Sequence, residues 1–275
     1  MDRYLFLGGG HLSGALITGL LASGCLAEQI SVLERHAERR QFLSEQFGIV
    51  VSDSLSDVIQ GATVCVLAVR PNDALTLLGQ FDIHLNQPVC LVSCVAGLSC
   101  AAIRTALPQN KLPILRAMPN LPAVLQAGMA GLYCEPGTAL VHRQAAERLL
   151  RAVGTVLWVE DEALMHAITA VSGSGPGYIF RLMQAMSLAA EKQGLTPEQA
   201  RISTVNTVFG AAKMALESPQ SFADLCEKVC VPGGTTEQGV AKMQSLEIDE
   251  IFVKIIASAR QRSEQLMLTG LDRKK

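Results

Sequence analysis

The stretch Tyr4-Leu5-Phe6-Leu7-Gly8-Gly9-Gly10-His11-Leu12-Ser13 decides the expected fold of this chain. Its apolar residues predict a short buried strand, and the apolar spacing after the glycines predicts a helix. A strand, a glycine turn and a helix in this order are typical of a dinucleotide-binding fold. In that motif Gly8 permits the tight turn, Gly10 lets backbone N–H groups approach a pyrophosphate, and Ser13 is small enough for close helix–strand packing. An ordinary glycine-rich turn is the alternative.

A second strand is expected at Ile30–Leu33 and ends at Glu34, about twenty residues beyond the glycines. An acidic residue at this place typically accepts hydrogen bonds from the adenosine ribose hydroxyls of a dinucleotide. Arg35, Arg39 and Arg40 follow, and they would instead attract a 2′-phosphate. The choice between NADH and NADPH stays open, with a slight lean to NADH because Glu34 would repel a 2′-phosphate. These charges also fit a solvated helix start.

Strand and helix patterns continue to alternate through the first half of the chain. A short helix is expected at Ser54–Gln60, a buried strand at Thr63–Val69, a helix at Pro71–Leu78 and a strand at Val89–Val95. Repeated units of this size predict a doubly wound parallel sheet that binds ligands at the carboxyl ends of its strands. Ser99 is expected to cap a helix that runs to Ala106, and Pro113–Arg116 leads into a further strand. The expected strand ends rich in Gly, Pro or Asn are Gly8–Gly10, Ala68–Pro71, Ser93–Gly97 and Met118–Asn120.

From about Glu162 the strand patterns stop and helical patterns take over. Within the expected helix Pro197–Glu217, apolar residues cover much of the circumference, and Phe209 and Leu216 belong to one apolar face. Such a helix must be buried, and a small helical domain has little interior, so we expect dimerisation through these helices. A compact bundle is the alternative. The other expected helices are Ala163–Ala170, Gly177–Gly194, Ser221–Lys228, Thr235–Leu246 and Ile248–Leu268.

The composition limits the classes of partner. The chain has 275 residues, of which 49% are hydrophobic, and a formal net charge of −2. This charge gives no electrostatic argument for binding nucleic acid or an anionic membrane. The eight cysteines are scattered without a Cys-x2-Cys pair and the histidines are isolated, so we expect no metal site. A lipoprotein-like pattern ending at Cys25 is interrupted by His11 and the glycines, and we expect a cytoplasmic protein.

Two glycine-rich segments stand out in the helical half. Ser172–Phe180 places three glycines and a proline where helix is expected, although Gly costs about 1 kcal/mol and Pro about 3 kcal/mol inside a helix. The backbone there is expected to come close to a ligand, or to a crossing helix. Val229–Thr236 places two glycines before a helix, which presents N–H groups to a carboxylate at the positive end of the helix dipole. A glycine loop with a threonine cap is the alternative.

Five segments, in order along the chain, resemble the signatures of the pyrroline-5-carboxylate reductases, the last enzymes of proline synthesis. Departures from the family pattern are His11, Ser13, Arg70, Leu121, Gly177 and Val231, which put efficiency and the substrate in doubt more than the fold. The five segments are Ala68–Pro71, Val92–Gly97, Arg116–Ala123, Ser172–Tyr178 and Val229–Thr236.

The resemblance implies an α/β Rossmann-like doubly wound parallel sheet domain, residues 1–160, followed by an all-α dimerisation domain, residues 161–275. The implied reaction is hydride transfer from NADH or NADPH to the C=N carbon of 1-pyrroline-5-carboxylate. Thr236 would be the catalytic residue, hydrogen-bonded to the ring nitrogen. Substrate would also be bound by Ser174, Gly175, Pro176, Gly233, Gly234 and Thr235. Cofactor would be bound by Gly8, Gly10, His11, Leu12, Glu34, Arg35, Ala68, Val69, Arg70, Pro71, Ala96, Gly97, Met118, Pro119 and Asn120.

Two alternatives remain at the level of the sequence. A paralogue that reduces another imine or a carbonyl, of the β-hydroxyacid dehydrogenase kind, would need a catalytic lysine in the helical half. Lys192 and Lys213 lie on expected helices there, without a matching motif around either. A non-catalytic nucleotide-binding regulator would tolerate loss of the substrate loop, and here Gly233–Thr236 is intact.

Overall fold

The computed structural model describes residues 2–84, 89–109 and 111–272. The chain forms two compact units, one made of Met1–Ser174 with Ser258–Lys275 and the other of Gly175–Ala257. The expected domain boundary near residue 160 remains a prediction, and these units divide the chain at a later residue. Helix α12 (Ile248–Asp272) contributes residues to both units.

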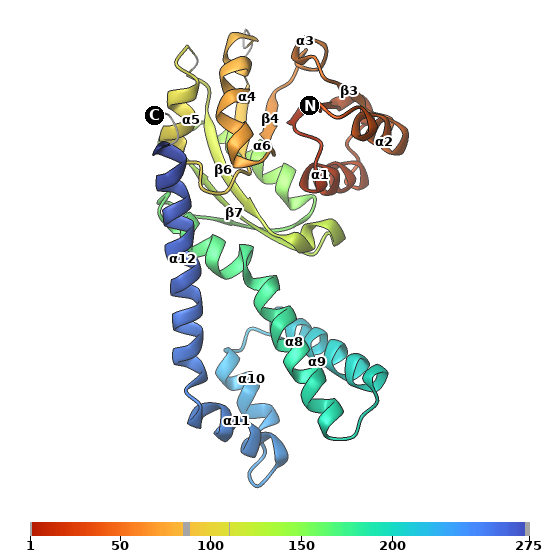
Figure 1. Ribbon diagram of the computed structural model, residues 1–275, viewed down its shortest axis with the longest axis vertical. Coiled ribbons are helices and arrows are strands. Elements are labelled where there is room, and N and C mark those ends of the chain that lie inside the picture. Colours follow the sequence, from red (N-terminus) through yellow and green to blue (C-terminus); the bar gives the residue numbers. More distant parts are fainter. Residues whose placement is uncertain (1, 85–88, 110, 273–275) are drawn as a thin grey trace. The chain divides into compact units, whose positions relative to one another are not determined.

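The first unit is built on an eight-stranded sheet with the strand order β3-β2-β1-β4-β5-β6-β7-β8. Strands β3, β4, β6 and β7 are labelled in Figure 1. Neighbouring strands are parallel from β3 to β6, which confirms the predicted doubly wound arrangement for this part of the sheet. The pair β6 and β7 is antiparallel, and β8 is parallel to β7. The strands are β1 (Tyr4–Leu7), β2 (Ile30–Leu33), β3 (Val50–Ser52), β4 (Val64–Leu67), β5 (Cys90–Ser93), β6 (Ile114–Pro119), β7 (Gly128–Cys134) and β8 (Gly154–Trp158).

Helices cover both faces of the sheet. Successive side chains of a strand point to opposite faces, so the apolar strands present side chains to be buried on each face. In β1, Tyr4 and Phe6 pack in a core with side chains of α1 (His11–Ala22), α2 (Ala37–Phe47) and α6 (Leu140–Arg151). Leu5 and Leu7 pack in a second core with α3 (Leu55–Val58), α4 (Pro71–His84) and α5 (Cys100–Ala106). A fully buried Leu or Phe contributes about 1.5–3 kcal/mol, so these two layers are a main source of stability.

The sequence patterns gave no expectation for β3, β7, α6 and β8. For α2 they gave only a possible helix start among the charges after Glu34. Gly128 and Gly131 weaken the strand signal of β7, since glycine has no side chain to pack. The fold requires both residues. A Cβ at Gly131 would lie 2.6 Å from Ile168, and one at Gly128 would lie 2.9 Å from the Cα of Ala123.

The later helices lie close to their expected ranges. Helix α9 (Pro197–Glu217) has the expected bounds, and the hydroxyl of Thr196 caps it by accepting a hydrogen bond from the N–H of Gln199. Among the described residues, no helix has the length and apolar character that crossing a membrane would require. The other helices are α7 (Leu164–Ile168), α8 (Gly175–Lys192), α10 (Phe222–Val229) and α11 (Thr235–Ser245), and Thr169–Gly173 forms a π-helical turn between α7 and α8.

Candidate functional site

The glycine turn lies where β1 and β4 are neighbours, which is the point at which the strand order reverses. Gly8 has φ +103°, in the region that favours glycine. A Cβ on Gly8 would also lie 2.6 Å from Cγ1 of Val69 and 2.9 Å from the carbonyl oxygen of Ala68. The turn and the end of β4 therefore require glycine at this position independently of any ligand.

At Gly10, unlike Gly8, the protein leaves room for a side chain. Gly10 is the N-cap of α1 with φ −67°, and a Cβ placed on it would meet nothing within 4 Å. No contact with the described residues of its unit therefore demands glycine there. The first N–H groups of a helix have no intrahelical partner, and those of His11 and Leu12 belong to this set. An open space before such N–H groups fits the approach of a pyrophosphate.

This contrast gives a matched pair of variants. Gly10→Val is expected to fold normally and to raise the dissociation constant of the nicotinamide cofactor at least about tenfold, because the added side chain fills the space before α1. Gly8→Ala is expected to lower the melting temperature instead. Cofactor titration and thermal melting of both variants check this. A folded Gly10→Val variant with unchanged cofactor affinity would rule out the site.

Ser13 is small and fully buried, as close packing of the helix against the strand requires. Its hydroxyl also donates a hydrogen bond to the carbonyl oxygen of Gly8, a role that the sequence did not indicate. The serine therefore stabilises the glycine turn directly.

Glu34 lies at the end of β2, as expected, and is buried. One carboxylate oxygen accepts a hydrogen bond from the N–H of Gly9 and the other from the N–H of His36, each at 2.9 Å. Arg35 is exposed and pairs with Asp73 at 3.4 Å. The cofactor-binding roles of Glu34 and Arg35 stay predictions, and in this structure the Glu34 carboxylate bonds to the protein backbone.

The loops after β4 and β5 border the same edge of the sheet. The N–H of Ala68 donates to the carbonyl oxygen of Leu7, so the chain continues beside β1 for one residue beyond β4. Arg70 and Pro71 are exposed, and Ala96 is half-buried. The predicted cofactor residue Gly97 has φ +72°, and a Cβ there would lie 3.1 Å from the backbone of Leu266 in α12. Contact with α12 therefore also explains this glycine.

Two of the signature segments meet within the first unit. The side-chain amide of Asn120 donates to the carbonyl oxygen of Ser172 at 3.2 Å and accepts from the N–H of Met129 at 2.9 Å. A Cβ on Gly173 would lie 2.8 Å from the methyl group of Met118. Asn120 and Met118 therefore hold the π-helical turn, an irregular helix form that is frequent at functional sites.

Ser174, Gly175 and Pro176 follow this turn. Ser174 donates its N–H to the carbonyl oxygen of Thr169, and Gly175 and Pro176 are the first residues of α8. Within their own unit, Cβ atoms on Gly175 or Gly177 would meet nothing within 4 Å, so a tight crossing inside that unit does not explain these glycines.

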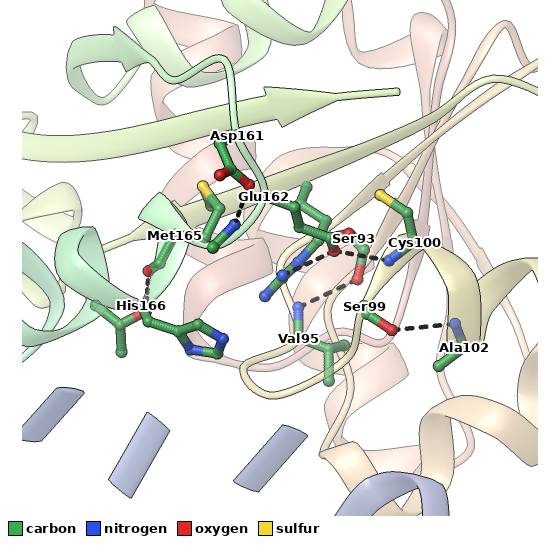
Figure 2. A network of polar contacts seen from close by, with 12 residues as sticks. Ser93, Val95, Ser99, Cys100, Ala102, Asp161, Glu162, Met165 and His166 are labelled. Carbon is green, nitrogen blue, oxygen red and sulfur yellow. Dashed lines mark hydrogen bonds and ion pairs between the residues drawn. The ribbon is translucent and has the colours of Figure 1, made fainter. Parts of the chain in front are cut away.

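A buried ion pair supports the strand ends, and Figure 2 shows its surroundings. Arg116 in β6 is 5% exposed. One carboxylate oxygen of Glu162 accepts two hydrogen bonds, one from the guanidinium of Arg116 at 2.9 Å and one from the N–H of Cys100 at 2.8 Å. Glu162 thereby joins β6 to the start of α5. Arg116 belongs to a segment singled out in the sequence, but no sequence signal pointed to Glu162.

Around this ion pair, burial disfavours the charged forms of two cysteine thiols and one imidazole. Burial raises the pKa of the Cys94 thiol to about 12 and raises the pKa of the Cys100 thiol as well. Burial, followed by the positive charge of Arg116, lowers the pKa of His166, whose ring shares a 2.9 Å hydrogen bond with the hydroxyl of Ser263. Burial therefore favours the neutral thiol at Cys94 and Cys100 and the neutral imidazole at His166.

The second unit carries the other glycine loop, which ends at α11. Gly233 has φ +75° and donates its N–H to the Glu237 carboxylate at 2.9 Å, and Gly234 donates to the carbonyl oxygen of Val231 at 2.9 Å. Thr235 and Thr236 begin the helix and are exposed. In the part of the chain that the structure describes, their hydroxyls make no hydrogen bond, and α11 has no side-chain cap. The threonine-cap alternative therefore finds no support.

Within residues 2–84, 89–109 and 111–272, no group of three or more His, Cys, Asp or Glu side chains is placed to hold a metal ion. The described arrangement offers glycine turns and helix N-termini as its binding elements.

Comparison with known proteins gives consistent matches over both units. Residues 162–266 match the family model described as pyrroline-5-carboxylate reductase dimerisation, and residues 3–97 match the one described as NADP oxidoreductase coenzyme F420-dependent. A pyrroline-5-carboxylate reductase of Pseudomonas aeruginosa is 39% identical, with 96% of each chain covered, and one of Haemophilus influenzae is 35% identical, with 95% of this chain and 96% of the relative covered. The structure of such a reductase from Coxiella burnetii matches with a TM-score of 0.93 at 36% identity, covering 96% of this chain and 98% of that one.

Proposed function

Since the chain belongs to the pyrroline-5-carboxylate reductase family, we propose that it reduces 1-pyrroline-5-carboxylate to proline with NADH or NADPH. The observation that carries this proposal is that one chain holds both an open glycine turn at α1 and an intact Gly233–Thr236 loop at α11. The first fits a dinucleotide and the second a small carboxylate.

The residues of the first unit fit a nicotinamide dinucleotide. Gly10 leaves space before the N-terminus of α1, and its neighbours His11 and Leu12 present free backbone N–H groups to a pyrophosphate. The Met118–Asn120 segment, held by its contacts with the π-helical turn, would line the nicotinamide side. When bound, the reduced nicotinamide supplies the hydride.

The residues of the second unit bind and orient the substrate. Because the N–H groups of Gly233 and Gly234 are engaged within the protein, those of Thr235 and Thr236 remain as the donors to the substrate carboxylate. The Thr236 hydroxyl is free for the ring nitrogen. A cyclic imine is readily protonated near neutral pH, so placement against the hydride donor matters more than a strong acid.

The lysine-dependent alternative finds no support in these contacts. Lys192 is exposed, and Lys213 lies on the surface of α9 with Glu217 at 3.9 Å. A catalytic lysine of a carbonyl reductase would need to be held within the site.

We further propose that the protein forms a homodimer through the helices of its second unit. Phe209 is 65% exposed and Leu216 is 85% exposed on α9, and the family model that matches this half describes a dimerisation region. Large exposed apolar faces mark interaction surfaces. Sedimentation at micromolar concentration is expected to show no folded monomer, and a monodisperse active monomer would contradict the proposal.

We place the enzyme in the cytoplasm. All eight cysteines are free thiols, as is usual for proteins of a reducing compartment.

One assay tests the activity. The purified protein is expected to oxidise NADH or NADPH in the presence of 1-pyrroline-5-carboxylate and not in its absence, with proline formed in equal amount. A protein that binds the cofactor but does not react with this imine, while it reacts with another imine or with a carbonyl, would overturn the substrate assignment.

A further inference from the structure

Two cysteine side chains meet where helix α10 ends, just before the Gly233–Thr236 loop. Cys226 lies on the last turn of α10, and Cys230 is the residue that ends the helix. Their sulfur atoms are 3.9 Å apart, in contact through an S–H···S hydrogen bond. The N–H of Cys230 also donates to the carbonyl oxygen of Cys226 at 3.1 Å. The backbone therefore brings the two thiols together beside the loop that we propose to bind the substrate carboxylate.

The two thiols differ in their access to reagents. Among the eight cysteines, all of which the structure describes, Cys226 is the exposed one. Cys230 is half-buried, and this burial, followed by the hydrogen bond with Cys226, raises the pKa of its thiol. Thiol–disulfide exchange requires a thiolate that can reach the other disulfide. Cys226 is therefore the thiol that reacts with a reagent from solution, and Cys230 is placed to react with Cys226.

A disulfide between these residues requires a movement at the end of α10. Cβ atoms four residues apart along a helix lie about 5–6 Å from each other, whereas a disulfide needs about 3.5–4.5 Å. Cys226 belongs to a helix whose start is held by reciprocal hydrogen bonds between Ser221 and Asp224, both at 3.1 Å. Cys230 has φ −90° and ψ 75°, outside the helical region. The movement therefore falls on Cys230.

The loop transmits such a movement to the N-terminus of α11. The N–H of Gly234 donates to the carbonyl oxygen of Val231 at 2.9 Å, which closes this segment into a tight turn. The N–H of Gly233 donates to the Glu237 carboxylate of α11 at 2.9 Å, so the turn is tied to the helix that follows. A displacement of Cys230 therefore shifts the first N–H groups of α11, which we propose to hold the substrate carboxylate.

We propose that Cys226 and Cys230 form a reversible disulfide that weakens substrate binding at the Gly233–Thr236 loop. The proposal rests on the proposed function, because it concerns the regulation of that site. The oxidant is a small disulfide such as glutathione disulfide. The Cys226 thiolate attacks one of its sulfur atoms and releases one glutathione, and the Cys230 thiolate then attacks the sulfur of Cys226 and releases the second. Two electrons pass to the glutathione disulfide, and the two protons lost by the protein thiols appear on the two glutathione thiols.

The test exposes the full-length protein to glutathione disulfide and follows its mass and its kinetics. The wild type is expected to lose the mass of two hydrogen atoms and to retain no bound glutathione. Trypsin cleaves after Lys228, which lies between the two cysteines, so it should leave two peptides joined by the disulfide.

The oxidised wild type is expected to lose at least about tenfold in kcat/KM for 1-pyrroline-5-carboxylate, the effect of one lost hydrogen bond to a carboxylate. Reduction with dithiothreitol should restore the activity. The dissociation constant of the nicotinamide cofactor should not change, because the glycine turn belongs to the first unit.

Cys226→Ser is expected to keep the activity of the reduced wild type and to lose the response to glutathione disulfide. The matched control is Cys25→Ser, which removes a half-buried thiol from the first unit. This control should form the disulfide and lose activity as the wild type does. If Cys226→Ser does not fold, Cys226→Ala replaces it, and the mass of the oxidised wild type still decides whether the disulfide forms.

An oxidised wild type without the disulfide, or with glutathione that stays on Cys226, would overturn the proposal. A disulfide that leaves kcat/KM unchanged would overturn its effect on the loop, and so would an equal loss of activity in Cys226→Ser. Failure of the proposed function gives a different result, since the reduced protein would then leave 1-pyrroline-5-carboxylate unreacted before any oxidant is added.

Discussion

Thr236→Ala is expected to lower kcat/KM for 1-pyrroline-5-carboxylate by roughly 10- to 150-fold. The lost interaction is one hydrogen bond to a charged ring nitrogen, worth about 1.5–3 kcal/mol. Cofactor affinity is expected to stay unchanged, because Thr236 belongs to the second unit and the glycine turn belongs to the first.

The structure makes this prediction sharper, because the Thr236 hydroxyl makes no hydrogen bond to any described residue and α11 has no side-chain cap. The melting temperature of Thr236→Ala should therefore match that of the wild type. Thr236→Ser keeps the hydroxyl and is expected to retain most of the activity. A Thr236→Ala variant with a lower melting temperature and full catalytic efficiency would assign Thr236 to the scaffold.

Glu162→Ala is expected to destabilise the protein by about 3–5 kcal/mol. The change leaves the guanidinium of Arg116 buried without its carboxylate, and an uncompensated buried charge has a cost of this size. The N–H of Cys100 loses its acceptor as well. Chemical denaturation followed by circular dichroism measures the change in the free energy of unfolding.

A surface ion pair provides the control for this prediction. Glu217 lies 3.9 Å from Lys213 with both side chains largely exposed, and Glu217→Ala is expected to cost less than about 1 kcal/mol. In the double variant Glu162→Ala with Arg116→Met, much of the loss should be recovered, because no charge is left buried. A Glu162→Ala variant as stable as Glu217→Ala would show that the buried pair contributes little.

The sequence predicted the part of the fold that depends on local patterns. Tyr4–Leu7 followed by three glycines and a helically spaced apolar run is enough to predict the first βα unit. Thr196 with Pro197 is enough to predict the start of α9. The strand β7 escaped prediction, because Gly128 and Gly131 are placed by close contacts with residues distant in the sequence and carry no strand signal of their own.

In the candidate site, too, some features follow from local sequence and others from tertiary contacts. The sequence by itself identified the glycine turn, the Met118–Asn120 segment and the Gly233–Thr236 loop, since each needs particular residue types at fixed spacing along the chain. Only the tertiary structure decided where the charged side chains point. Glu34 could face a ribose or the glycine turn from the same position in the sequence, and Glu162 gained its role from Arg116, 46 residues earlier. The physical reason is that spacing along the chain fixes backbone conformation, whereas the partner of a buried charge is chosen by the packing that surrounds it.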